Sequence, residues 1–227
     1  MYANSRAITT AQLAPHHALH MRLSRMLARP WRQPFANHNI ATFTRMEREY
    51  EARLPDYPGG LILDSGCGVG LSTRQLAVQY PDSVVIGIDR SEARLTRDHG
   101  PLPGNAMLCR ADLGDFWRLA HEASWAPARH YLLYPNPYPK AGQLKRRWQG
   151  HPVFPTLVAL GGRIELRSNW SVYVEEFASA LAFVAQRPQV AVAPFDPGTD
   201  FLTPFERKYH LSGQTLWRCV ETLPHRS

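Results

Sequence analysis

Cysteine is scarce in this sequence, and long apolar runs are absent. The 227 residues include three cysteines, Cys67, Cys109 and Cys219, whose spacing matches no metal-binding motif. This pattern excludes a disulfide-rich secreted domain and favours buried thiols in a reducing, cytoplasmic compartment. The ten histidines are scattered, so no metal site is predicted. No stretch of roughly 18 apolar residues occurs, and we therefore expect no membrane span.

Acidic residues are missing from the first 46 positions, where arginine is frequent. The positive charge there accounts for most of the formal net charge of +7. Localised positive charge suits a polyanionic partner such as RNA. An arginine-rich segment without acids is also typical of organelle-targeting peptides, and composition leaves that alternative open. The arginines are Arg6, Arg22, Arg25, Arg29, Arg32 and Arg45.

The chain divides by pattern into a basic arm with an amphipathic helix, residues 1–54, and a domain, residues 55–227. The arm contains several prolines, and we expect it to be mobile up to about residue 38, with one short helix at 18–28. A second helix is predicted over 40–54. Strand patterns then alternate with helical patterns, which predicts an α/β, doubly wound and mostly parallel sheet. The strands are expected at 61–64, 84–89, 106–110, 130–134, 163–167, 190–193 and 215–221.

A glycine-rich motif, DSGCGVG, lies between the first predicted strand of the domain and the next helix. Gly66, Gly68 and Gly70 allow a sharp turn and a close approach of backbone to ligand. Asp89, nineteen residues after Gly70, ends the second strand and can accept hydrogen bonds from ribose hydroxyls. The Asp64 carboxylate would repel a pyrophosphate but suits the sulfonium and ammonium groups of S-adenosylmethionine. The motif resembles the first motif of class I methyltransferases.

Four polar side chains fall at or just beyond the carboxyl ends of predicted parallel strands. These ends meet at one edge of such a sheet, where ligands bind. We therefore expect these residues to form the cofactor site, and S-adenosylmethionine to be the cofactor. They are Asp64, Asp89, Asp112 and Asn136.

A proline-rich loop with a basic run, YPNPYPKAGQLKRRW, follows the fourth strand of the domain. Its three prolines restrict the backbone and fix the directions of Asn136, Tyr138 and Lys140. The run that follows offers cations for phosphate contacts. We expect this loop to be a substrate platform, with phosphate contacts from Lys145, Arg146 and Arg147.

Three segments resemble tRNA (guanine-N7)-methyltransferases, which methylate guanine 46 of tRNA. The proline loop resembles the family's PDPWPK segment with its KRR cluster. RSNWSVYVEEF, residues 167–177, resembles its TDW segment, and TPFERKYHLSGQTLW, residues 203–217, resembles its TxFE segment. The resemblance covers roughly residues 58–220 and excludes the arm.

The resemblance implies a class I methyltransferase fold of seven strands with an antiparallel last strand. It also implies S-adenosylmethionine as cofactor, tRNA as partner, a cytoplasmic location and a monomer or homodimer. Lys140, Asn169 and the segment from Thr203 to Glu206 would bind the substrate. This chain has Asn136 and Asn169 where the family has aspartates, and Tyr138 where the family has tryptophan. Glu206 therefore remains as the family acid that could stabilise a positively charged purine beside Asn136.

Two alternatives stay open. Asn136, Pro137 and Tyr138 are similar to the NPPY loop of amino methyltransferases, although the order here is Asn, Pro, Tyr, Pro. That similarity favours transfer to an amine. Alternatively, the missing acids would suit a tRNA-binding protein of the same fold that does not catalyse, although the intact glycine motif favours retained cofactor binding.

Overall fold

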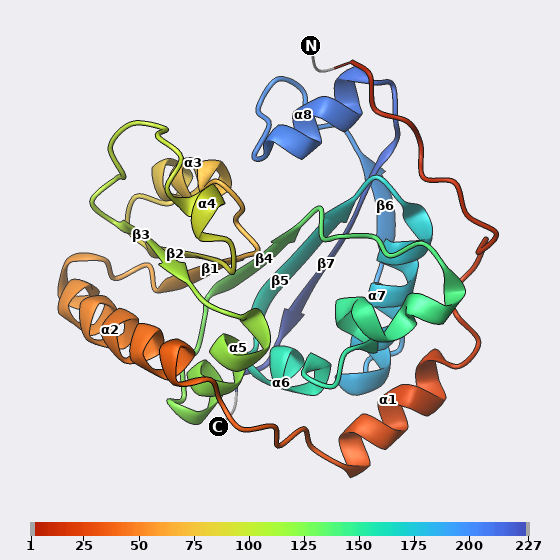
Figure 1. Cartoon of the computed structure of the whole chain (residues 1–227), viewed down its shortest axis with the longest axis horizontal. Helices are drawn as coiled ribbons and strands as arrows, with labels where there is room; N and C mark the ends of the chain where they lie inside the picture. The colour runs from red at the N-terminus through yellow and green to blue at the C-terminus, as the bar shows by residue number, and fades with distance from the viewer. Residues whose placement is uncertain (1–2, 226–227) are drawn as a thin grey trace.

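Residues 3–225, which the computed structural model describes, form one seven-stranded sheet in the order β3-β2-β1-β4-β5-β7-β6 (Figure 1). The first five strands in this order are parallel, and β7 runs antiparallel to both β5 and β6. This confirms the predicted fold. The strands are β1 (Leu61–Ser65), β2 (Val84–Asp89), β3 (Ala106–Arg110), β4 (Arg129–Leu133), β5 (Gly162–Ser168), β6 (Val192–Phe195) and β7 (Leu216–Leu223).

The central strands are buried on both sides because helices cover both faces. Every residue of β1 and β2 is buried, as expected for parallel strands with continuous apolar runs. Leu61 and Leu63 point into one core, and Ile62 between them points into the other. The strands begin and end within two residues of the predicted positions.

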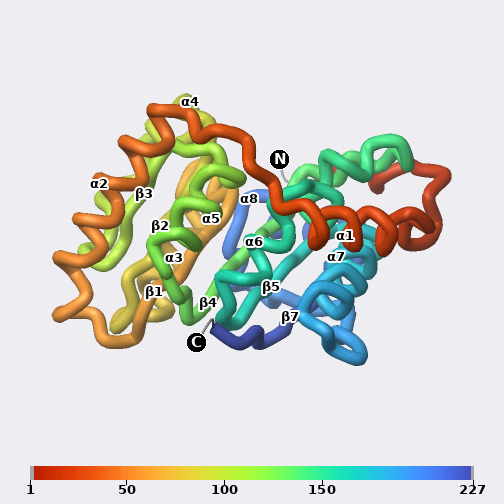
Figure 2. Tube along the Cα trace, turned by 90° about the horizontal axis from the view of Figure 1, so that it is seen from below, coloured from red at the N-terminus to blue at the C-terminus, as the bar shows by residue number. Residues whose placement is uncertain are grey.

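In the described part of the chain, five helices pack on one face of the sheet, namely α1, α2, α5, α6 and α7, and α3 and α8 pack on the other. Figure 2 shows α1, α6 and α7 side by side on the first face. No helix within residues 3–225 is long and apolar enough to cross a bilayer. The helices are α1 (Leu19–Ala28), α2 (Asn37–Arg53), α3 (Leu71–Gln79), α4 (Glu92–Leu95), α5 (Leu113–Glu122), α6 (Phe154–Ala159), α7 (Ser171–Val184) and α8 (Pro204–Leu211), with 3-10 turns η1 (Leu54–Asp56), η2 (Ala141–Arg146) and η3 (Trp148–Gly150).

The N-terminal segment is anchored to the domain, so the prediction of a mobile arm is wrong. In Figure 1 it runs from beside α8, along α7, to α1. The Ser5 backbone N–H donates to the Ser212 hydroxyl at 3.0 Å, and the Thr10 hydroxyl donates to the Pro139 carbonyl at 2.5 Å. Leu19, Leu23 and Met26 of α1 are buried in the main core. Their spacing along one helix face was the signal for this packing.

Candidate active site

The glycine motif forms a left-handed turn between β1 and α3. Gly66, Gly68 and Gly70 have φ angles of 84°, 60° and 75°, in a region that favours glycine. The Gly66 N–H donates to the Ile88 carbonyl at 2.8 Å, which fixes the turn against β2. A Cβ atom added at Gly68 would meet no atom within 4 Å. The turn therefore presents backbone to open space that a ligand can occupy.

Asp64, near the end of β1, is a buried carboxylate that has no counter-charge among the described residues. It is 1% exposed and accepts hydrogen bonds from the hydroxyls of Ser72 at 2.6 Å and Thr73 at 2.7 Å. Burial raises the pKa of Asp64 to about 6, with a further rise from the charge of Asp89, although the two hydrogen bonds oppose it. No cation forms an ion pair with it within residues 3–225. A cationic ligand would supply the missing charge.

Asp89 supports the glycine turn from the neighbouring strand. One carboxylate oxygen accepts from the Gly68 N–H at 3.0 Å, and the other accepts from the Ser91 N–H at 2.8 Å. Arg94 lies 3.6 Å from the carboxylate. Asp64 and Asp89 therefore lie at the same sheet edge, on adjacent parallel strands, with the turn between them.

Asp112, just beyond β3, is exposed and caps α5. Its carboxylate accepts from the backbone N–H groups of Gly114 at 2.8 Å and Asp115 at 3.3 Å. The start of α2 also reaches this position, because Asn39 accepts from the Asp112 N–H and donates to the Asp115 carboxylate at 2.7 Å. A Cβ at Gly114 would come within 3.0 Å of the Trp31 ring. No local pattern in the arm indicated that Trp31 and Asn39 border the site.

The proline loop leaves β4, the sheet neighbour of β1, in a conformation fixed by two left-handed tyrosines. Tyr134 and Tyr138 have φ angles of 52° and 43°, which are uncommon for residues with side chains. Asn136 and Lys140 are exposed, and the Arg146 guanidinium lies 5.5 Å from the Tyr138 ring. Both exposed side chains are therefore accessible, as a substrate platform requires.

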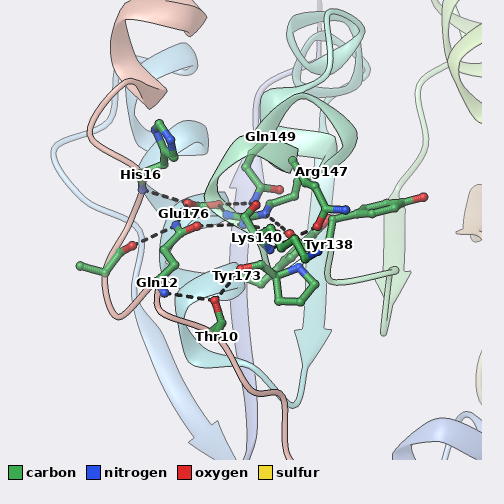
Figure 3. Close-up of polar contacts among 12 residues, drawn as sticks. Thr10, Gln12, His16, Tyr138, Lys140, Arg147, Gln149, Tyr173 and Glu176 are labelled. Carbon is green, nitrogen blue, oxygen red and sulfur yellow. Dashed lines mark hydrogen bonds and ion pairs between the residues drawn. The ribbon is translucent and has the colours of Figure 1, made fainter.

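Arg147 is buried, and the prediction that it contacts substrate phosphates is wrong. Its guanidinium pairs with Glu176 of α7 at 2.6 Å, and both side chains are fully buried (Figure 3). The same guanidinium donates to the backbone carbonyls of Tyr138 at 2.9 Å and Lys140 at 3.3 Å. Arg147 therefore fixes the proline loop through hydrogen bonds from the protein interior. Lys145 and Arg146 are exposed, as a phosphate contact requires.

Glu206 is also buried, so the prediction that it faces the reacting purine is wrong. Its carboxylate accepts from Arg167 at 2.9 Å, from the Tyr134 hydroxyl at 3.0 Å and from the Leu202 N–H at 2.7 Å. The Thr203 hydroxyl accepts from the Glu206 N–H at 2.9 Å. Thr-x-x-Glu at a helix start is the sequence signature of a capping box. The family resemblance instead implied a substrate-binding role for Thr203 and Glu206.

Asn169 lies directly after β5 and is half-buried. Its side-chain amide donates to Gln214 at 2.8 Å, and Gln214 donates in turn to the Ser5 carbonyl at 2.9 Å. The segment that resembles the TDW motif is therefore linked to the N-terminal segment. Within residues 3–225, the expected cofactor residues fall at the ends of four adjacent parallel strands, whereas the side chains of Arg147, Thr203 and Glu206 make contacts within the protein.

The residues at this edge fit S-adenosylmethionine. Gly68 leaves room for a ligand against the turn, and the buried Asp64 carboxylate lacks a cation that the ligand's positive charge would provide. Asp89 has carboxylate oxygens at the end of β2, where a ribose can be recognised. Asp64, Asp89, Asp112 and the glycine turn would hold the cofactor.

The fold is that of class I S-adenosylmethionine-dependent methyltransferases, and S-adenosylmethionine is the cofactor that this fold implies. A 16S rRNA adenine methyltransferase from Catenulisporales acidiphilia, solved with this cosubstrate, superposes with a TM-score of 0.53 at 20% identity. The superposition covers 79% of this chain and 92% of that one. No protein-family model matches the chain.

Curated relatives include two kinds of methyltransferase. The tRNA (guanine-N7)-methyltransferase of Thiobacillus denitrificans is 28% identical over 174 residues, which are 70% of this chain and 73% of that protein. The trans-aconitate 2-methyltransferase of Methylobacterium radiotolerans is 37% identical over 109 residues, or 44% of this chain. That match spans 38% of the trans-aconitate enzyme, so the chain covers little more than a third of its length.

Proposed function

We propose that this protein is an S-adenosylmethionine-dependent methyltransferase that acts on tRNA and methylates N7 of a guanine. The observation that carries the proposal is the place of the proline loop. It starts at the end of β4, next to the strand that bears Asp64, and leads into the exposed cations Lys145 and Arg146. A nucleobase at Asn136 and phosphates at the basic turn would suit this arrangement.

The comparison with the tRNA enzyme supports the same substrate class, because its similarity extends over 70% of this chain. The shorter similarity to the trans-aconitate enzyme is compatible with a shared cofactor-binding half. The basic character of η2 favours a polymer with many phosphates over a single small acid.

The proposed chemistry depends on alignment. When bound, S-adenosylmethionine supplies an electrophilic methyl group. The N7 atom of guanine has an exposed lone pair in the ring plane, so this chain needs no general base, and orientation of the reactants provides much of the rate enhancement. Asn136 would bind the edge of the base, Tyr138 would contact its face, and Lys140, Lys145 and Arg146 would contact the backbone. Asn169 would remain a supporting residue at this edge.

A second candidate is transfer to a small carboxylic acid. The 37% identity with the trans-aconitate enzyme favours it, because this exceeds the 28% identity with the tRNA enzyme. The two candidates differ in the size of the acceptor, so a direct comparison of acceptors separates them.

The test is an assay with radiolabelled S-adenosylmethionine and two acceptors, unfractionated tRNA and trans-aconitate. Label in tRNA, followed by strand cleavage after borohydride and aniline treatment, is expected for methylation at N7 of guanine. Labelled tRNA that resists this cleavage would favour the amino methyltransferase alternative. Label in trans-aconitate alone would overturn the proposal. Cofactor binding by calorimetry without transfer to any acceptor would favour the non-catalytic alternative.

A further inference from the structure

A basic groove lies beside α1, apart from the predicted cofactor residues. It has a volume of about 560 Å³, and we call it the α1 groove. One wall consists of α1 and the residues that follow it, and the other wall consists of η2. Among residues 3–225, no aspartate or glutamate lines it. The cations that line it are Arg22, Arg25, Arg29, Arg32 and Lys145.

These cations carry charge that the described residues do not neutralise. Arg25, Arg29, Arg32 and Lys145 are exposed, and none of the groove cations forms an ion pair within residues 3–225. Burial lowers the pKa of Arg22, and the charge of Arg25 lowers it further. Like charges held together repel one another, so a polyanion in the groove would be favoured.

The walls of the groove are held together by partly buried hydrogen bonds and one buried ion pair. The Arg22 side chain donates to the Gly150 carbonyl at 2.6 Å, which connects α1 to η3. The Glu176 carboxylate accepts from the Gln12 amide at 2.6 Å and from the His16 N–H at 2.8 Å, and it also pairs with Arg147 (Figure 3). The segment that leads into α1 and the turn that forms the other wall therefore meet at one carboxylate. The groove is formed before any partner binds, which reduces the entropy lost on binding.

The α1 groove is continuous with the proline loop. Lys140 caps η2, and η2 then supplies the groove residues Ala141, Gly142 and Lys145. Arg147 holds the loop carbonyls with the same guanidinium that binds Glu176. A nucleic acid with one base at Asn136 would therefore pass from the loop along η2 into the groove.

We propose that the α1 groove binds the phosphate backbone of the RNA substrate. This inference rests on the proposed function and extends it, because it assigns a binding site to an N-terminal segment that the family resemblance does not cover. The negative charge of phosphates is complementary to the positive charge of the groove, and a single strand of RNA would lie between the two walls. Arg25, in the last turn of α1, and Arg29, which directly follows the helix, contact neighbouring phosphates along the RNA strand.

The test compares two double variants that remove the same charge. The groove variant is Arg25→Ala/Arg29→Ala. The control variant is Arg48→Ala/Arg187→Ala, which removes two exposed arginines that do not line the groove and form no ion pair within the described residues. Binding of fluorescein-labelled unfractionated tRNA is measured by anisotropy at several salt concentrations. Calorimetry with S-adenosylmethionine measures cofactor binding in the same preparations.

The groove variant is expected to bind tRNA more weakly than wild type and to lower the slope of log affinity against log salt by about two, since each phosphate contact contributes about one. Its affinity for S-adenosylmethionine should equal that of wild type. Equal tRNA binding by the groove and control variants would overturn the groove inference but leave the proposed function intact. Wild type that binds cofactor but not tRNA would overturn both. Binding of the groove to phosphatidylglycerol vesicles in preference to tRNA would overturn the groove inference alone.

Discussion

Replacing Asp64 with asparagine changes the charge of the cofactor site while retaining its shape. This carboxylate is 1% exposed, and no cation pairs with it within residues 3–225. An asparagine oxygen can still accept the hydrogen bonds that Ser72 and Thr73 donate. The substitution therefore isolates the effect of the buried charge.

The magnitude follows from the pKa of Asp64, which burial raises from 3.8 to about 6. Between these values the folded state binds more protons than the unfolded state, so the contribution of Asp64 to the free energy of unfolding falls as pH rises through this window. At about 1.4 kcal/mol per pKa unit, ionisation destabilises the cofactor-free protein by about 3 kcal/mol at pH 7. Asp64→Asn is therefore expected to be about 3 kcal/mol more stable than wild type at pH 7 and about as stable near pH 4.

Urea unfolding of both proteins between about pH 4 and pH 7 measures this difference. Asp82→Asn, at an exposed position, is the control and should show no such dependence on pH. Calorimetry should show that Asp64→Asn loses S-adenosylmethionine binding, and that the affinity of wild type falls about tenfold per pH unit below pH 6. A variant less stable than wild type at pH 7, or a stability difference that is independent of pH, would refute the inference that Asp64 is a buried, uncompensated charge.

Three further substitutions test the buried contacts around the site. Glu206→Ala leaves the donors Arg167 and Tyr134 without their acceptor, and urea titration should show a free energy of unfolding that is lower by about 3 kcal/mol. An unchanged value would contradict the structural role of Glu206 and favour a contact with substrate. Thr203→Ala removes the N-cap of α8 and should lower the free energy of unfolding by about 1 kcal/mol, whereas Thr203→Ser should retain most of the stability. Arg147→Ala breaks a fully buried ion pair and should lower the free energy of unfolding by about 3–5 kcal/mol. The same substitution should make residues 3–16 susceptible to proteolysis. Arg146→Ala, at the exposed neighbour, should leave stability and proteolysis unchanged, and equal effects of the two arginine variants would contradict the assignment.

The strands of the sheet could be predicted from the sequence because the patterns that indicate them extend over only a few neighbouring residues. The apolar runs that become β1 and β2 are continuous, and fully buried parallel strands require such runs. The glycine spacing likewise predicted a sharp turn, which Gly66, Gly68 and Gly70 form with positive φ angles. In contrast, α6 and α8 are short and were not predicted, since six to eight residues give little periodicity to detect.

Side-chain roles were harder to predict where the partner is distant in sequence. Lys145, Arg146 and Arg147 form an unbroken basic run, and nothing in the run distinguishes its last member. Arg147 is buried because it meets Glu176, 29 residues later, and Gln12, 135 residues earlier. The same limit applies to Glu206 of α8, whose partners are Arg167 of β5, 39 residues earlier, and Tyr134, directly after β4 and 72 residues earlier.

The sequence alone determined the order of strands and helices, the turn that presents backbone to a ligand, and the set of polar residues at the ends of the strands. These depend on backbone preferences and on hydrophobic periodicity over a few residues, which the chain encodes locally. Only the tertiary structure decided which charges are buried, how the N-terminal segment packs, and that α1 and η2 enclose a basic groove. Such features depend on contacts between segments far apart in the chain, where burial selects one partner among many.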